Sequence, residues 1–262
     1  MSETPPPPRL LDLPLGFDAE PVEKRIGLVI LATDHTTEPD FARMVGGPDV
    51  GLYVARIAYA NPTTPANLRA MQPDLARAAA LLLPDERLDA ICYSCTSASI
   101  VIGDEAIAAA IREGKPGVPV VTPTRAAVEA LRAHGARRIS ILTPYTQETS
   151  ASVAPYFEAH GFTVEALSCL GLDDDRRMAR LDAATLREAA AAALAPGSDA
   201  LFVSCTALRS AAVADEIERA LGRPVVTSNL ATAWACARLV GERPRSEARL
   251  ADLPLPDPAA FA

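Results

Sequence analysis

The sequence predicts an α/β fold made of two related halves that each hold a parallel sheet. From about residue 25, short runs rich in valine and isoleucine alternate with longer, alanine-rich runs, a pattern typical of parallel strands connected by helices. Segments of the first half recur in the second half in the same order. The chain has 262 residues, 49% of them hydrophobic, which is enough for the core of one large domain or two small ones.

Strands are predicted where apolar residues run continuously between polar or turn residues. They are expected at 25–31, 51–58, 89–93, 118–122, 138–142, 162–167, 199–203 and 224–227. Helices are predicted where apolar residues recur at three- and four-residue spacing. They are expected at 65–83, 97–112, 123–134, 147–160, 183–194, 209–221 and 230–240.

The internal repeat is clearest around two cysteines. Residues 89–97 read DAICYSCTS and residues 199–207 read DALFVSCTA, so that Cys95 and Cys205 occupy matched positions. The sequence PVVT occurs at 119–122 and again at 224–227, and KRIGL at 24–28 resembles RRISI at 137–141. Three matches in the same order indicate the duplication of one α/β unit rather than a solenoid.

Composition excludes several classes of partner. The net charge is −8 and no basic stripe is present, so no nucleic acid is expected. No run of 18 apolar residues occurs, so no membrane span is expected. Five cysteines, an odd number, and an N-terminus without a secretory signal pattern favour a cytoplasmic protein whose cysteines are free thiols.

Each Ser-Cys-Thr segment follows a predicted buried strand and precedes a predicted helix. Ligands of parallel α/β sheets bind beyond the carboxyl ends of the strands. The free N–H groups of a helix N-terminus lower the pKa of a thiol and bind a carboxylate. We therefore expect Cys95 and Cys205 to lie on either side of one small carboxylate substrate, with the hydroxyl groups of Thr96, Ser97 and Thr206 beside them.

Two thiols on opposite faces of a substrate suit two reactions. One thiolate can remove a proton next to a carboxylate while the other thiol returns it to the opposite face. Alternatively, one thiolate can add to an activated double bond while the other thiol acts as the proton donor. No nucleotide-binding motif occurs. Cys92 and Cys95 form a C-x-x-C, but it has no second ligand pair and its side chains would point to opposite faces of a strand, so no cofactor and no metal are expected. Cys92, Cys169 and Cys236 lack this context and are predicted to be core residues.

These motifs resemble the aspartate/glutamate racemase superfamily. The resemblance rests on the two Ser-Cys-Thr strand ends, on Thr143-Pro144-Tyr145 after the first strand of the second half, and on the run from Cys169 to Leu181. It covers roughly residues 24–241. Within the superfamily the chain is most similar to the branch with maleate cis-trans isomerase, arylmalonate decarboxylase and the ectoine-utilisation racemase-like proteins.

The resemblance implies two pseudo-symmetric Rossmann-like domains with the active site in the cleft between them. The first domain would comprise residues 23–120 and 225–243, because the last helix returns to it, and the second residues 121–224. Proline-rich tails are expected at 1–22 and 244–262. A homodimer is the default expectation for an enzyme of this size and family.

The resemblance also implies roles for individual residues. Cys95 would add to the olefin of a maleate-like substrate, and Cys205 would act as the acid and base. Thr96, Ser97, Tyr145 and the backbone around Thr206 would hold the carboxylate and the enediolate.

Two positions depart from the maleate isomerase pattern. That enzyme has one asparagine in the loop after the first strand, where this chain has Asp34 or His35, and another where this chain has Asp175. Two carboxylates in place of two amides, unless protonated or turned away, would repel a dicarboxylate, which favours a substrate with an amine or amide beside its carboxylate.

Three functions remain open at this stage. The first is an isomerase or racemase of a small carboxylate. The second is a lyase that decarboxylates a malonate-type acid or hydrates an unsaturated acid; because the decarboxylases keep only the second cysteine, Cys95 disfavours decarboxylation. The third is a small-molecule binding protein without catalytic activity.

Overall fold

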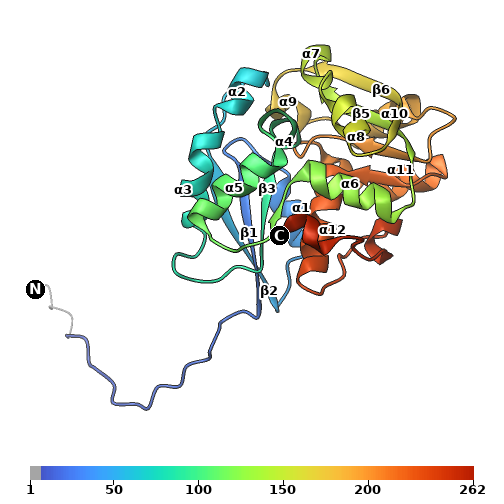
Figure 1. The fold of residues 1–262 in the computed structure, drawn as a ribbon. Coiled ribbons are helices and arrows are strands. Elements are labelled where there is room, and N and C mark those ends of the chain that lie inside the picture. Colours follow the sequence, from blue (N-terminus) through green and yellow to red (C-terminus); the bar gives the residue numbers. More distant parts are fainter. Residues whose placement is uncertain (1–6) are drawn as a thin grey trace, which may run out of the picture.

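The computed structural model describes residues 7–262 and contains two parallel four-stranded sheets. The sheets form two lobes, and an N-terminal segment extends away from the first lobe (Figure 1). The first sheet has the order β2-β1-β3-β4 and the second the order β6-β5-β7-β8. The strands are β1 (Lys24–Leu31), β2 (Val50–Ile57), β3 (Ala90–Ser94), β4 (Val120–Val121), β5 (Arg138–Tyr145), β6 (Thr163–Leu172), β7 (Ala200–Val203) and β8 (Val225–Thr227). The predicted α/β fold with two matched parallel sheets is confirmed.

Helices follow most of the strands. They are α1 (Thr37–Met44), α2 (Pro65–Arg69), α3 (Leu75–Ala80), α4 (Thr96–Ile102), α5 (Asp104–Gly114), α6 (Pro123–Ala133), α7 (Gln147–Ser150), α8 (Val153–Ala159), α9 (Asp175–Met178), α10 (Ala183–Ala193), α11 (Ala214–Leu221) and α12 (Ser228–Leu239). Short 3-10 helices lie at Gln72–Asp74, Arg209–Ala212, Arg249–Asp252 and Pro258–Phe261.

Several helices predicted as continuous are interrupted. The helix expected at 65–83 is divided at the 3-10 turn that contains Pro73, because proline cannot donate the backbone hydrogen bond that a helix interior needs. The helix expected at 97–112 is divided at Gly103, whose φ of 98° glycine adopts without the strain that a side chain would cause. The apolar spacing identified the buried faces correctly, but it carries no information about these breaks.

The two lobes share a core around α6 and α12. One hydrophobic cluster includes residues from both sheets together with the fully buried Trp234 of α12. Two further clusters each belong to a single half. The α12 helix contacts α1, α6, β3 and β8, so the helix after the last strand packs against elements of both halves.

The chain after α12 is not free in solution. Leu250 and Phe261 are buried, and the carbonyl of Leu253 accepts hydrogen bonds from the Trp234 indole and the Arg238 guanidinium at 2.9 and 3.0 Å. The segment expected as a C-terminal tail is therefore docked on α12. In the part of the chain that the structure covers, no helix has the length and apolar character needed to cross a membrane.

Candidate functional site

Cys95 lies directly beyond the carboxyl end of β3 and caps the N-terminus of α4. Its backbone is extended, with φ −158° and ψ 107°, and its side chain is 6% exposed. The Sγ atom lies 3.7 Å from the hydroxyl of Ser97. The backbone N–H of Ala98 also points toward the thiol and lowers its pKa. The first-half cysteine thus has the helix N-terminal setting predicted for it.

Cys205 occupies the matching position after β7, but its backbone differs. Its φ is 98°, a region that residues with a side chain rarely adopt. A turn and the 3-10 helix Arg209–Ala212 follow it, so the helix expected at 209–221 starts as a 3-10 helix and Cys205, unlike Cys95, does not cap an α-helix. The turn nevertheless directs the backbone N–H groups of Ala207 and Leu208 toward its thiol.

The expectation of lowered thiol pKa values is also wrong. Burial raises the pKa of Cys95 to about 11, and the nearby carboxylates of Asp175 and Asp34 contribute to this increase. Burial raises the pKa of Cys205 to about 12, and the charge of the Cys95 thiolate raises it further. Desolvation therefore outweighs the N–H donors. The effect of Cys95 on Cys205, and of both thiols on Tyr59 and Tyr145, indicates that the two thiols share one environment.

A serine links the two cysteine turns. Ser228, the first residue of α12, accepts a hydrogen bond from the Thr96 hydroxyl at 2.9 Å and another from the Cys205 backbone N–H at 3.0 Å. In the opposite direction, the Thr206 hydroxyl donates to the Ser94 carbonyl at 3.3 Å. The two Ser-Cys-Thr segments are thus joined directly and through Ser228, which the sequence analysis did not identify.

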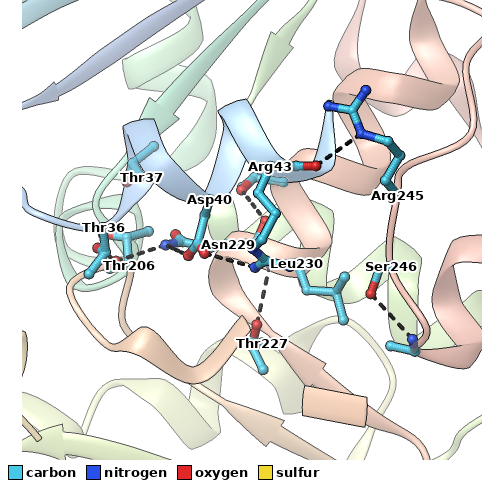
Figure 2. Close-up of polar contacts among 12 residues, drawn as sticks. Thr36, Thr37, Asp40, Arg43, Thr206, Thr227, Asn229, Leu230, Arg245 and Ser246 are labelled. Atoms are coloured by element: carbon cyan, nitrogen blue, oxygen red, sulfur yellow. Dashed lines mark hydrogen bonds and ion pairs between the residues drawn. The ribbon is translucent and has the colours of Figure 1, made fainter. Parts of the chain in front are cut away.

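A second contact ties the Cys205 turn to the first half. Figure 2 shows the Asn229 amide directed toward both α1 and the Cys205 turn. It donates to the carboxylate of Asp40 at 2.9 Å and to the carbonyl of Thr206 at 3.0 Å. The hydroxyl of Thr36 donates to the same carbonyl. Because its hydroxyl and carbonyl are both engaged, Thr206 holds the two halves together.

Three tyrosines surround the thiols. Tyr145, predicted as a substrate-binding residue, ends β5 and is buried beside Cys205. Tyr93 on β3 and Tyr59 after β2 were not predicted, although Tyr93 lies two residues before Cys95 and strand alternation places both on one face. Burial raises the pKa of all three phenols, which keeps them neutral. Within residues 7–262 the buried Tyr93 hydroxyl has no hydrogen-bond partner.

Asp34 anchors the start of α1. Its Oδ1 accepts hydrogen bonds from the backbone N–H groups of Thr36 and Thr37, both at 2.8 Å, and its Oδ2 accepts one from the Thr37 hydroxyl at 2.7 Å. Burial raises the pKa of this carboxyl, which the three hydrogen bonds partly offset. Both oxygens are therefore occupied by the first turn of a helix. His35 beside it is exposed.

Asp175 has a different environment. It opens α9 and is buried, although the acidic run that contains it resembles a solvated loop in sequence. Its Oδ1 accepts a hydrogen bond from the Asn61 amide at 2.8 Å, and its Oδ2 accepts one from the Thr33 hydroxyl. Asp175 also raises the pKa of Tyr59 and of Cys95. The carboxylate of Asp175 therefore lies near the first thiol, held by two neutral donors that the sequence analysis missed.

Two of the remaining cysteines, Cys92 and Cys236, are core residues as predicted, whereas Cys169 on β6 is only partly buried, so its prediction as a core residue is wrong. All five are free thiols. Cys92 and Cys236 are buried together in the core that both halves share, whereas Cys95 belongs to a cluster of the first half. Cys92 and Cys95 therefore face opposite sides of β3, as strand alternation requires. In the described part of the chain, no three histidine, cysteine or acidic side chains lie close enough to hold a metal ion.

The chain is similar in sequence to arylmalonate decarboxylases and maleate isomerases. The model of the arylmalonate decarboxylase family matches residues 70–251. Arylmalonate decarboxylase of Bordetella bronchiseptica is 35% identical over 138 residues, which is 52% of this chain and 57% of that protein. Maleate isomerase of Pseudomonas putida is 27% identical over 233 residues, 84% of this chain and 93% of that protein.

Solved structures give the same two groups. A double mutant of arylmalonate decarboxylase in the liganded form has a TM-score of 0.79 and 29% identity, covering 87% of this chain and 99% of that one. A mutant maleate cis-trans isomerase of Nocardia farcinica with a covalently bound succinylcysteine intermediate has a TM-score of 0.78 and 26% identity, covering 87% of this chain and 98% of that one.

Proposed function

The chain belongs to the arylmalonate decarboxylase family, and within it we propose that this protein is an isomerase or racemase of a small carboxylic acid that uses Cys95 and Cys205 together. The observation that carries the proposal is the pair of buried thiols at matched strand ends, close enough that Cys95 affects the ionisation of Cys205. A family whose members include decarboxylases and isomerases accommodates this chemistry.

In the racemisation form of the proposal, one thiolate removes the proton from the carbon next to the substrate carboxylate. The electron pair of that C–H bond moves into the carboxylate and forms an enediolate. The other thiol then donates its proton to the opposite face of the same carbon, so that the two sulfurs exchange protonation states. Neither step requires a cofactor.

In the cis-trans form, the Cys95 thiolate adds to one olefinic carbon of an unsaturated diacid. The former double bond becomes a single bond that rotates, and loss of the thiolate restores the double bond in the trans form. The succinylcysteine intermediate of the Nocardia farcinica relative supports this course. Cys205 would act as the acid and base.

The enediolate shared by both forms needs hydrogen-bond donors. We assign this role to the N-terminus of α4, to the hydroxyl of Ser97 and to the Tyr145 phenol, which burial keeps protonated. Donors fixed in a water-poor site stabilise the charge that develops in the transition state. Thr96, by contrast, donates to Ser228, so we assign its side chain a positioning role.

Decarboxylation is the second candidate, because the family model and the Bordetella bronchiseptica relative both carry that activity in their names. Loss of CO₂ from a malonate-type acid would leave an enediolate, which one thiol could protonate. This reaction needs one proton donor only, and we expect it to depend chiefly on Cys205.

Proton NMR in D₂O tests the proposal. Purified protein is incubated with maleate, with a malonate-type acid such as phenylmalonate, and with a panel of chiral amino and hydroxy acids, beside the Cys95→Ala and Cys205→Ala variants. The proposal requires fumarate formation or exchange of the α-proton that both variants lose. Loss of CO₂ that persists in Cys95→Ala would favour the decarboxylase instead, and inertness of the wild type toward the whole panel would count against both.

A further inference from the structure

The carboxylate of Asp175 is buried and is held by neutral donors. Among residues 7–262, no lysine, arginine or histidine forms an ion pair with Asp175 or with Asp34. The neighbouring Arg176 pairs with Asp174 and is half exposed. Buried charges in proteins are normally paired, but the Asp175 carboxylate has no ion-pair partner among residues 7–262.

Asp34 is a buried carboxylate of the same chain whose two oxygens are both occupied by hydrogen bonds from one helix start. It receives two backbone N–H groups and a hydroxyl from the start of α1, and the positive end of that helix adds favourable charge. Asp175 receives one amide and one hydroxyl. Both of its donors are neutral side chains, and each oxygen keeps a lone pair for a further donor.

The Asp175 carboxylate acts on its neighbours: it raises the pKa of Cys95 and, more weakly than the paired Asp174, that of the half-exposed Arg176. The Tyr59 phenol also lies near Asp175, because Cys95, Asp175 and Cys205 all raise the pKa of that phenol. A second substrate carboxylate placed here would meet this negative charge at short range, where repulsion in a buried site is large. The end of the site near Asp175 therefore suits a hydrogen-bond donor, and a positively charged donor most of all.

We infer that Asp175, positioned by Thr33 and Asn61, binds a protonated amine of the substrate, so that the enzyme acts on an amine-bearing carboxylic acid. The inference rests on the proposed function and specifies its substrate class. The substrate carboxylate faces the α4 N-terminus and Tyr145, the reacting carbon lies between the thiols, and the ammonium group lies against Asp175.

The same contact explains how a buried thiol is activated. Without substrate, the carboxylate of Asp175 opposes ionisation of Cys95. An ammonium group next to Asp175 cancels that charge and places a positive charge near the sulfur, which favours the thiolate. Substrate binding thus supplies part of the electrostatic stabilisation that the chain itself does not provide.

The test compares acids that differ only in an amine or a hydroxyl. The probes are alanine with lactate, aspartate with malate, and 4-aminobutyrate with 4-hydroxybutyrate, with dissociation constants measured by calorimetry on wild type, Asp175→Asn and Asp173→Asn. Asp173 is exposed, so its variant removes the same charge two residues away. We expect at least one amine to bind the wild type and the Asp173→Asn variant more tightly than its hydroxyl partner. In Asp175→Asn this preference should fall by roughly tenfold to a hundredfold, the range of a charged hydrogen bond.

A second measurement needs no ligand. Thiolate absorbance is titrated in each protein with and without Cys95→Ala, which isolates the Cys95 thiol. Asp175→Asn should lower the pKa of Cys95 in the free protein, and Asp173→Asn should leave it unchanged. Circular dichroism of the same samples checks that the asparagine variant is folded, because unfolding alone would also lower the pKa of the thiol toward 9.

Two results would overturn the inference: no amine preferred over its hydroxyl partner by the wild type, or a preference that survives in Asp175→Asn. The results can reject the two-thiol reaction and the amine site independently of each other. Amine binding that depends on Asp175 without any α-proton exchange keeps the amine site and rejects the two-thiol reaction. Thiol-dependent exchange on acids without an amine preference keeps the reaction and rejects the amine site.

Discussion

The turns at Cys95 and Cys205 have nearly the same sequence and different backbones. Cys95 is extended and starts the regular helix α4. Cys205 has a φ of 98° and leads into a turn and a 3-10 helix. Both nevertheless direct backbone N–H groups toward the sulfur. Both copies of the duplicated unit thus place N–H donors at the thiol, but in the second half this placement requires a strained backbone at Cys205.

Strain of this kind costs about 1–3 kcal/mol and persists only where the surroundings enforce it. At Cys205 the surroundings are identifiable. Ser228 holds its N–H, and Asn229 and Thr36 hold the carbonyl of the next residue. The comparison indicates that α12, which begins with Ser228 and Asn229, positions the second thiol relative to the first.

The largest effect is expected from removing either sulfur. Cys95→Ser and Cys205→Ser should each lower the rate of α-proton exchange or isomerisation by about 10²–10⁴-fold, the usual contribution of a general acid or base. A hydroxyl keeps the shape of the site but ionises far less readily than a thiol. Steady-state kinetics measure the loss, and a rate within a few-fold of wild type in either variant would contradict the paired role.

The pH profile should reflect the raised thiol pKa values. Because Cys95 and Cys205 ionise near 11 and 12 in the free protein, kcat/KM should rise about tenfold per pH unit above neutrality while a thiolate is required. A profile that is flat from pH 7 to pH 10 would show that neither buried thiol must ionise in the free enzyme.

The free energy of unfolding should fall with rising alkaline pH, whereas kcat/KM rises. An unfolded thiol ionises near pH 9, below both folded values, so the folded state retains protons that the unfolded state has lost. The resulting stabilisation is complete below about pH 9 and disappears as pH rises toward the folded pKa values. Thermal unfolding should show a steeper alkaline decline for wild type than for a protein in which both cysteines are alanine.

Ser228 tests the link between the two turns. Ser228→Ala leaves the Cys205 N–H and the Thr96 hydroxyl without their acceptor, which should cost about 1–3 kcal/mol and lower kcat about tenfold. Ser210→Ala is the matched control, because the Ser210 hydroxyl is buried without a partner among residues 7–262. Equal effects of the two substitutions in denaturant unfolding and kinetics would exclude the linking role.

The smallest effect concerns the backbone itself. Cys205→Gly should be more stable than Cys205→Ala by about 1 kcal/mol, because glycine adopts positive φ without strain. At Cys95 the extended backbone accommodates either residue, so the difference between glycine and alanine should be smaller there. Chemical denaturation of the four variants measures both differences. An equal difference at the two positions would show that the Cys205 backbone is relaxed.

Much of this architecture was predictable from the sequence. Continuous apolar runs located the strands, and the repeated Ser-Cys-Thr located both thiols, because local composition and duplication can be read directly from a sequence. The positive φ of Cys205 was not predictable, since nothing in SCTAL differs in kind from SCTSA. It arises from contacts with α12, more than twenty residues away.

The polar surroundings of the site were harder to predict. Tyr93 could have been found by strand alternation from Cys95. Asn61, Thr33 and Ser228 could not, because they reach the site from other elements and carry no local pattern. Asp175 was identified by resemblance, but its burial against Asn61 depends on the packing of the two halves.

A double-mutant cycle tests the central claim most directly, that both thiols act on one substrate as a unit. The rate of α-proton exchange or isomerisation is measured for wild type, Cys95→Ala, Cys205→Ala and the double variant. Residues that act as a unit show strongly non-additive losses, so we predict that the double variant is no slower than the slower single variant. Losses that multiply would show that the two thiols act independently and would contradict the account.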